Sequence, residues 1–498
     1  MVSVVVDFRR AREVGPVRRR TFGSFVEHLG RCVYSGIYEP GHPTADARGF
    51  RRDVLDLVRE LGVTLVRYPG GNFVSGYRWE DGIGPRQSRP RRLDLAWRST
   101  ETNEVGVDEF LAWCREADCE PMMAVNLGTR DTASALDLLE YCNHPGGTDW
   151  SARRAANGAP EPYGIRLWCL GNEMDGPWQL GHRSAAQYGS LAARTAAAMK
   201  QYDPALELVV CGSSGSAMPT FGEWERVVLE EAYDHVDYVS CHAYYEQHGA
   251  DRASFLASAV DMEGFIDAVV ATADHVAARR RAARRIDISF DEWNVWYLSQ
   301  EPDRKTDDAW PVAPRLLENV YSTVDAVVVG SLLITLLRRS DRVTAACQAQ
   351  LVNVIAPIMT EPGGPAWRQT TFYPFALTAR LAAGTVLAPT IDAGTVPTDR
   401  YGPVAAVDAV GTLDADRAAV FLVNRSPVEA ATVQLPLWSE LPAQTVTATT
   451  LGGDDLDAVN TLHDPLRVVP SVNRSIRLAG DCVEVELPPA SWTAVEFA

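Results

Sequence analysis

The sequence predicts an α/β protein, a (β/α)8 TIM barrel with a C-terminal antiparallel β-sandwich domain. Short apolar runs alternate with amphipathic patterns of helical period from about residue 20 to residue 384. After residue 384 the pattern changes to alternating apolar and polar positions separated by turn residues. The length of 498 residues also suits a large domain and a smaller one better than a single core.

Eight apolar runs form the predicted barrel. Each is almost continuously apolar, as expected for parallel strands whose faces are both covered. Eight such units, separated by helices, favour a closed barrel over a doubly wound sheet. In chain order the runs span residues 20–30, 63–71, 121–128, 165–173, 206–215, 236–245, 286–294 and 343–355.

Amphipathic segments between these runs predict the helices. In residues 50–62 the apolar side chains recur on one helical face. The apolar stretch between Asp325 and Arg338 is too short to cross a bilayer and predicts a buried helix. The other predicted helices span residues 108–119, 132–142, 185–202, 221–233 and 255–283.

The last part of the chain predicts an antiparallel β module. Alternating runs lie at residues 405–410, 418–424, 445–451, 482–487 and 491–497. The N-terminal run VSVVVDF is expected to join this module as a further strand. We therefore expect three segments: residues 1–18 as the N-terminal strand, 19–384 as the catalytic barrel and 385–498 as the β-sandwich.

Charge and cysteine content exclude some partners. The formal net charge is −18, from 65 acidic and 47 basic residues, so nucleic acid and anionic membranes are not expected partners. The nine cysteines are dispersed without metal-ligand spacing and predict free thiols in a reducing compartment. The N-terminus lacks the layout of a signal peptide, so we expect a cytoplasmic protein.

Two glutamates stand out at the ends of the predicted strands. In barrel enzymes the active site lies at the carboxyl ends of the strands. Glu173 ends the fourth run and Glu292 ends the seventh, so their side chains should face each other across the barrel mouth. Glycoside hydrolysis uses two carboxyl groups, and retention of configuration requires them at roughly 5 Å. The pair therefore predicts a glycoside hydrolase, with Glu173 as general acid/base and Glu292 as nucleophile.

Neighbouring residues fit a sugar site. Asn172 precedes Glu173 and could hold a sugar hydroxyl beside the acid. Aromatic residues that suit a sugar ring also gather at these strand ends; they are Trp178, Tyr244, Trp293, Trp296 and Tyr297. The sequence contains no HExxH zinc motif, no GxGxxG phosphate loop and no GxSxG nucleophile elbow.

Six segments in chain order resemble one known family. They are FGSFVEH (22–28), RYPGGNF (67–73), RLDLAW (92–97), GNEMDGPWQ (171–179), DEWNVWY (291–297) and AQLVNVI (349–355). Together they resemble glycoside hydrolase family 51, the α-L-arabinofuranosidases. The resemblance runs along essentially the whole chain.

This resemblance implies a retaining, exo-acting α-L-arabinofuranosidase that uses no metal or other cofactor and forms a homo-oligomer, commonly a hexamer. Its substrates would be terminal non-reducing arabinofuranosyl residues of arabinan, arabinoxylan or derived oligosaccharides. Trp97 and Trp296 would be aromatic walls near the leaving group. The residues implied around the furanose are Glu27, Arg67, Asn72, Asn172, His242, Tyr244 and Gln350.

Other functions remain open at this point. An endo-glucanase or a xylosidase could use the same barrel and the same two glutamates. A non-catalytic carbohydrate-binding protein could keep the fold, although the presence of both glutamates argues against it. Turnover of aryl arabinofuranoside, aryl xyloside and a cellulose oligomer would separate these functions.

Overall fold

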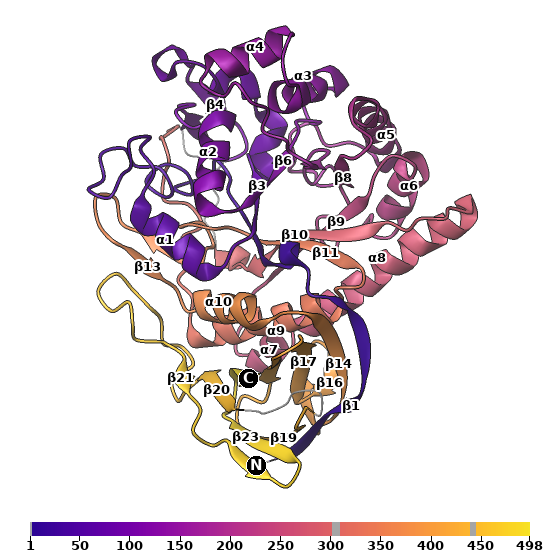
Figure 1. The fold of residues 1–498 in the computed structure, drawn as a ribbon, viewed down its shortest axis with the longest axis vertical. Helices are drawn as coiled ribbons and strands as arrows, with labels where there is room; N and C mark the ends of the chain where they lie inside the picture. The colour runs from indigo at the N-terminus through magenta and orange to yellow at the C-terminus, as the bar shows by residue number, and fades with distance from the viewer. Residues whose placement is uncertain (1, 301–308, 439–444) are drawn as a thin grey trace.

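The computed structural model describes residues 2–300, 309–438 and 445–498. The chain folds into a barrel with helices around it and a β-sheet domain at one side (Figure 1). The N- and C-termini both lie in the sheet domain, so the chain begins and ends there and forms the barrel in between. The predicted fold class is confirmed.

Eight parallel strands close the barrel in the order β10-β11-β2-β3-β6-β7-β8-β9. Each strand overlaps one of the eight predicted apolar runs. Their side chains pack inside the barrel and against the surrounding helices, which explains the apolar runs. The strands are β2 (Gly23–Phe25), β3 (Leu65–Tyr68), β6 (Glu120–Ala124), β7 (Leu167–Cys169), β8 (Glu207–Val210), β9 (Tyr238–Tyr245), β10 (Asp287–Val295) and β11 (Val343–Gln348).

The helices follow the predicted segments with three differences, one of which is that α10 (Phe372–Leu381) was not predicted. The predicted helix 255–283 is two helices, because the chain breaks at Ala257 and Ser258 while burial continues on both sides. A short polar helix, α4, has only Ser151 and Arg154 buried and was not predicted. The helices are α1 (Arg52–Leu61), α2 (Val107–Ala117), α3 (Thr132–Asn143), α4 (Asp149–Ala156), α5 (Ala185–Tyr202), α6 (Glu223–Ala232), α7 (Arg252–Leu256), α8 (Ala259–Arg280), α9 (Thr323–Arg338) and α10 (Phe372–Leu381).

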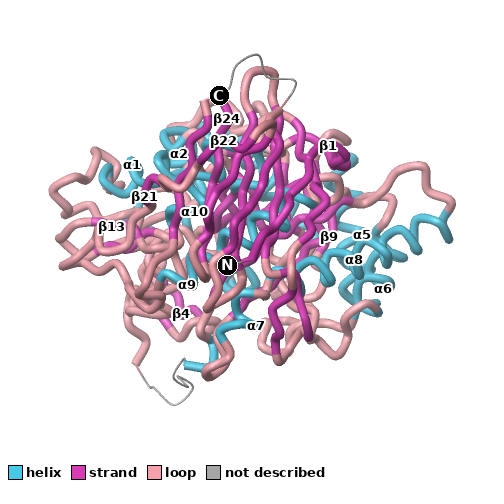
Figure 2. Tube along the Cα trace, turned by 90° about the horizontal axis from the view of Figure 1, so that it is seen from below, coloured by secondary structure: helices cyan, strands magenta, loops and turns pink. Residues whose placement is uncertain are grey.

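The second domain is built on a ten-stranded sheet, whose strands cover the face seen in Figure 2. β1 (Val2–Pro16) lies inside this sheet, antiparallel to β14 (Thr385–Asp392) and parallel to β19 (Ala431–Pro436). The β1–β19 pair is thus a parallel exception in an otherwise antiparallel arrangement. The other strands are β17 (Val407–Leu413), β18 (Ala418–Asn424), β20 (Val446–Leu451), β21 (Ser471–Val472), β22 (Arg477–Ala479), β23 (Cys482–Leu487) and β24 (Ser491–Phe497).

Three short hairpins complete the described strands. They are β4 (Arg92–Asp94) with β5 (Ser99–Glu101), β12 (Ile358–Thr360) with β13 (Ala366–Arg368), and β15 (Thr395–Thr398) with β16 (Gly402–Ala405). No helix in residues 2–300, 309–438 and 445–498 has the length and apolar character needed to cross a bilayer.

Helix α9 joins the two domains. It is buried along almost its whole length, as its apolar sequence predicts. Gly330 lies where Trp492 of β24 packs against the helix, and a Cβ at this position would come within 2.2 Å of Trp492 Cδ1. The missing side chain therefore lets the helix and the sheet approach closely.

A buried ion-pair cluster lies at the same junction. Asp408 of β17 accepts hydrogen bonds from Arg338 of α9 and from Arg425, each at 2.5 Å. Burial alone would raise the pKa of Asp408, but the two guanidinium groups outweigh it and lower this pKa to about 2. The charged form of Asp408 therefore stabilises the folded state.

We expect Asp408→Asn to lower the free energy of unfolding by about 3 kcal/mol, because it leaves the buried Arg425 without an anion and Arg338 with Glu263 alone. Because the folded pKa lies below the unfolded value of about 3.9, the contribution of the wild-type aspartate is complete above that value and is lost as the pH falls toward 2. The difference in melting temperature between wild type and variant should thus be constant near pH 6–7 and should narrow below about pH 4. Asp455→Asn, which removes an exposed partner of Arg467, is the control and should change little. Equal melting temperatures of wild type and Asp408→Asn at pH 7 would contradict this account.

Candidate active site

A cavity of about 1390 Å³ opens at the carboxyl ends of the barrel strands. It is the site at which a TIM-barrel enzyme is expected to act. Arg67 and Asn172 do not line it but lie buried directly behind it, hydrogen-bonded to each other. The other predicted site residues all line the cavity: Glu27, Asn72, Trp97, Glu173, His242, Tyr244, Glu292, Trp296 and Gln350.

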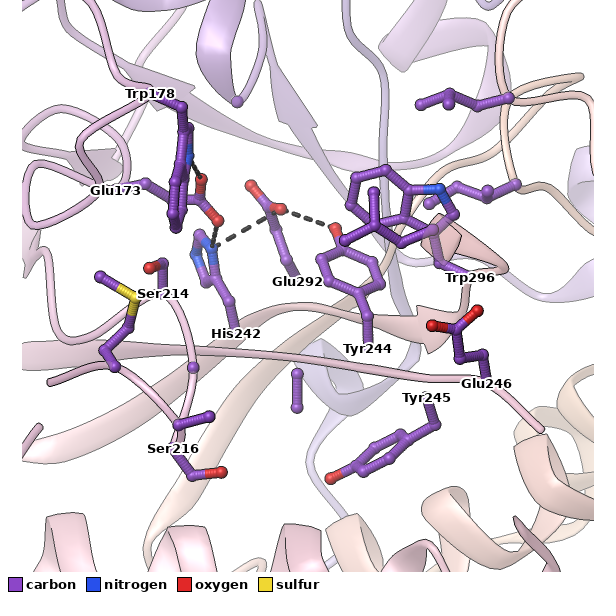
Figure 3. A pocket seen from close by; sticks show the side chains of 18 of the residues that line it. Glu173, Trp178, Ser214, Ser216, His242, Tyr244, Tyr245, Glu246, Glu292 and Trp296 are labelled. Carbon is purple, nitrogen blue, oxygen red and sulfur yellow. Dashed lines mark hydrogen bonds and ion pairs between the residues drawn. The ribbon is translucent and has the colours of Figure 1, made fainter. Parts of the chain in front are cut away.

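The two predicted catalytic glutamates face each other across this cavity (Figure 3). Glu173 follows β7, and Glu292 lies within β10. One oxygen of each carboxyl group and one ring nitrogen of His242 lie within 4.8 Å of one another. This separation is that of a retaining carboxylate pair, roughly 5 Å. The same three groups would also suit a metal ion, although the family resemblance implies none.

Glu292 is fixed by two hydrogen bonds. Its Oε1 accepts a hydrogen bond from Arg67 at 2.7 Å, and its Oε2 accepts one from the Tyr244 hydroxyl at 2.6 Å. Burial raises the pKa of Glu292; the charge of Glu173 raises it further, while His242, Arg67 and Tyr244 act in the opposite direction. The carboxylate is thus held rigidly, with both oxygens bonded.

A bulge in β10 explains why two consecutive acidic residues reach the site. Ser289 pairs with Ser240 of β9, but Glu292 pairs with His242, so β10 carries one extra residue in this interval. Such a bulge redirects side chains. Asp291 thereby contacts the cluster as well, at 3.1 Å from His242 Nε2 and 3.6 Å from Arg67 Nε.

Glu173 has a different environment. Its Oε1 lies 2.9 Å from His242 Nδ1, and its Oε2 accepts a hydrogen bond from Trp178 Nε1 at 2.8 Å. Trp178 is 54% exposed, so the second oxygen meets a side chain on the solvent side. The backbone of Glu173 has φ 41°, an unusual conformation for a residue other than glycine that is often found at functional sites.

His242 connects the acidic groups. Its two ring nitrogens contact Glu173 and Asp291. Burial lowers the pKa of His242, but Glu292, Asp291 and Glu173 outweigh burial and raise it well above its usual value. A charged His242 and Arg67 then face the three carboxyl groups of Glu173, Asp291 and Glu292.

Glu27 lines another part of the cavity wall. It accepts hydrogen bonds from the Phe73 amide, the Trp97 indole and the Gln350 amide, each at 2.9 Å. Burial raises the pKa of Glu27 to about 7, although the Phe73 and Trp97 hydrogen bonds lower it. A carboxylate of this kind can accept a hydrogen bond from a sugar hydroxyl.

Gly70 and Gly71 allow the backbone to lie against both acidic groups. A Cβ at Gly71 would be 3.1 Å from Glu292 Oε1, and one at Gly70 would be 2.8 Å from Glu27 Cγ. The RYPGGN segment thus brings Asn72 beside the glutamates. Asn172 donates to Asn72 at 3.3 Å and accepts from Arg67 at 2.7 Å, which links these amides to Glu292.

Two polar groups of predicted site residues that line the cavity have no hydrogen-bond partner among the described residues. They are the Gln350 Oε1 and the Trp296 Nε1 atoms, both buried. The Trp296 ring packs edge-on against Tyr244, with centroids 5.0 Å apart. A buried acceptor and a buried donor without partners are the features that hydroxyl groups of a bound sugar would satisfy.

Three residues of the site were not predicted as functional. Asp291 lies in the DEWNVWY segment, but only the bulge shows that it faces the cluster. Trp178 was noted only as one of several aromatic residues, and its bond to Glu173 depends on the loop after β7. Asp94 accepts hydrogen bonds from the backbone amides of Ala96 and Trp97 and so orients Trp97 toward Glu27. Its position three residues before Trp97 in the RLDLAW segment is the sequence feature from which this role could have been predicted.

Comparisons with known proteins show which family the chain resembles. Residues 57–261 match the model of the α-L-arabinofuranosidase 1 domain, and residues 291–491 match the α-L-arabinofuranosidase C-terminal domain. An exo-α-(1→6)-L-arabinofuranosidase from Bifidobacterium longum is 60% identical over 97% of this chain and 95% of its own. An intracellular exo-α-(1→5)-L-arabinofuranosidase from Streptomyces lividans is 58% identical over 97% of this chain and 74% of its own.

A solved structure shows the same architecture over the full length. A family 51 α-L-arabinofuranosidase from Bifidobacterium longum is 52% identical, covers 100% of both chains and superposes with a TM-score of 0.97. At this identity and coverage the family is shown, and it decides between the activities that the sequence analysis left open. The chain therefore belongs to the α-L-arabinofuranosidases of glycoside hydrolase family 51.

Proposed function

We propose that this arabinofuranosidase removes terminal non-reducing arabinofuranose by double displacement with retention of configuration. The observation that carries the proposal is the separation of less than 4.8 Å between carboxyl oxygens of Glu173 and Glu292. At this distance one carboxylate reaches the anomeric carbon directly, with no room for an intervening water.

In the first step Glu292 attacks the anomeric carbon while Glu173 donates a proton to the departing oxygen. Arg67 and Tyr244 hold the Glu292 oxygens, so the attacking group needs little reorganisation. Burial raises the pKa of Glu292, while the charges of His242 and Arg67 lower it and so favour the ionised nucleophile that this step requires.

In the second step Glu173 removes a proton from water, which attacks the glycosyl ester and frees Glu292. The Oε2 of Glu173 faces Trp178 at the open side of the site, where water enters. Glu27, Gln350 and Asn72 would bind furanose hydroxyls throughout, Asn172 would hold Asn72 from behind the cavity, and Trp97 and Trp296 would enclose the sugar.

We propose arabinan, arabinoxylan or oligosaccharides derived from them as the natural substrates. The relatives are named for exo-action on α-(1→6) and α-(1→5) linkages, which is consistent with arabinofuranosyl chains as substrates. The neutral sugars also suit a protein with a net charge of −18, which would repel acidic polymers.

Location, assembly and domain division are further proposals. A cytoplasmic location is supported by the intracellular relatives and by nine free cysteine thiols. A homo-oligomer, a hexamer by resemblance to the family, is supported by exposed apolar side chains such as Leu466, Val472 and Leu478. The division into residues 1–18, 19–384 and 385–498 is supported by the place of β1 in the C-terminal sheet.

The stereochemical outcome tests the mechanism. Hydrolysis of 4-nitrophenyl α-L-arabinofuranoside in the presence of methanol should yield methyl α-L-arabinofuranoside, because methanol attacks the glycosyl ester from the face that water uses. Proton NMR during the first turnovers would identify the anomer. Formation of a β-configured product would contradict double displacement, and a protein that releases no nitrophenol would contradict the activity itself.

A further inference from the structure

The cavity extends well beyond the two glutamates. Its lining includes Ser214 and Met218 of the loop after β8, and also a second region on the outer side of β9, beside α7 and the turn of the β15–β16 hairpin. We call this region, lined by Tyr245, Asp251, Asp261, Arg400 and Tyr401, the outer lobe. None of its residues takes part in the mechanism described above.

We propose that the outer lobe binds the second and later sugar units of the leaving oligosaccharide. This inference rests on the proposed function, because it assigns the part of the substrate that departs when Glu173 protonates the glycosidic oxygen. It makes the outer lobe a determinant of substrate length, separate from the furanose site.

The position of the acid fixes the direction of the leaving chain. The glycosidic oxygen must lie next to Glu173, so the leaving sugar extends to the Glu173 side of the site. Figure 3 shows Ser214 on this side of His242, opposite Tyr244 and Trp296, and Ser216 further along. This direction differs from the one implied by the family resemblance, which places Trp296 near the leaving group. Asp175 anchors this wall by accepting the Ser214 amide and hydroxyl at 2.9 and 3.1 Å.

The path also reaches the surface. A second, more open cavity of about 780 Å³ shares His248, Asp251 and Asp399 with the first and extends to Pro427 of the C-terminal domain. A leaving chain can therefore run from Glu173 through the outer lobe to solvent without a closed end. This is the geometry that an exo-acting enzyme needs if its substrate is longer than a disaccharide.

The chemistry of the outer lobe fits a neutral sugar. Tyr245 donates to Asp261 at 3.1 Å, and Asp251 accepts the Ser254 amide at 3.0 Å, so these carboxylates already serve as acceptors. They disfavour an anionic ligand. Arg400 lies over the Tyr401 ring at 5.7 Å from its centroid, and among the described residues no carboxylate lies within ion-pair distance of it.

Tyr401 and Arg400 are the groups best placed to contact such a chain. Tyr401 is partly buried and Arg400 is exposed, and the Arg400 backbone is held by a bond to Ser254 Oγ at 3.1 Å. The aromatic ring offers a face for a pentose, and the guanidinium offers donors to its hydroxyls. The hairpin turn thus brings residues of the C-terminal part of the chain to a path that begins at the barrel.

Hydrolysis of α-(1→5)-linked arabino-oligosaccharides of two to five units tests the inference. For Tyr401→Ala, kcat/KM for the pentaose relative to the biose should fall about 5- to 10-fold, because the biose ends before the outer lobe. Arg400→Ala should reduce the same ratio, and it tests the inference independently if Tyr401→Ala folds poorly. The control is Tyr202→Ala, since Tyr202 is a tyrosine 40% exposed on α5, outside both cavities.

The outcomes distinguish a failure of the outer lobe as a subsite from a failure of the proposed function. If wild type cleaves nitrophenyl arabinofuranoside with retention but the folded variants keep the wild-type ratio of pentaose to biose, the outer lobe is not a subsite and the inference is overturned. Equal losses on the biose and the pentaose would overturn it too. If wild type does not hydrolyse the aryl glycoside, the proposed function itself is wrong. This test uses wild type alone and does not depend on the variants.

Discussion

Glu292→Gln should abolish turnover of every arabinofuranoside, with kcat/KM lower than that of wild type by roughly 10⁴- to 10⁶-fold. Glutamine keeps the shape of the side chain and its place between Arg67 and Tyr244, but the amide cannot form the glycosyl ester. The loss should be the same for substrates with good and poor leaving groups, because attack on the anomeric carbon precedes everything else.

The measurement is kcat/KM for 4-nitrophenyl α-L-arabinofuranoside and for an arabinobiose, with circular dichroism and melting temperature of each variant. Glu161→Gln is the matched control, since Glu161 is an exposed glutamate outside the cavity. An activity of Glu292→Gln within tenfold of wild type would exclude Glu292 as the nucleophile.

The barrel and its two glutamates were predictable because both follow from short-range patterns. Continuous apolar runs mark parallel strands, and the residue that ends such a run in a TIM barrel faces the active site. Glu173 and Glu292 could therefore be placed at the mouth before any coordinates. Their separation could not, since it depends on strand tilt and on the bulge that redirects Glu292 and Asp291 in β10.

Other features depended on long-range packing and left little trace in the sequence. The break between α7 and α8 interrupts a segment whose apolar residues continue on both sides, so periodicity alone predicts one helix. The outer lobe joins residues near 251 and 400, which become neighbours only because β15 packs near α7. The Asp408 cluster likewise joins β17 to α9.

Removing the acid/base should have an effect that depends on the leaving group. Glu173→Ala should lower kcat/KM for an arabinobiose by about 10²- to 10⁴-fold, because the alkoxide of a sugar leaves poorly without a proton. Nitrophenolate needs no such help, so kcat/KM for the aryl glycoside should change far less. Its kcat should still fall, because Glu173 also activates the water of the second step, and the glycosyl ester of Glu292 should accumulate.

Azide distinguishes this role from a structural one. The anion attacks the glycosyl ester without a general base, so it should restore kcat for the aryl glycoside and give α-L-arabinofuranosyl azide. Glu173→Gln keeps the size and shape of the side chain beside His242 and Trp178, and it should respond to azide in the same way. If Glu173 only oriented His242, both substrates would lose activity together and azide would not rescue either. That result, in folded variants, would remove Glu173 from the acid/base role and with it the reason for placing the leaving chain beside Ser214.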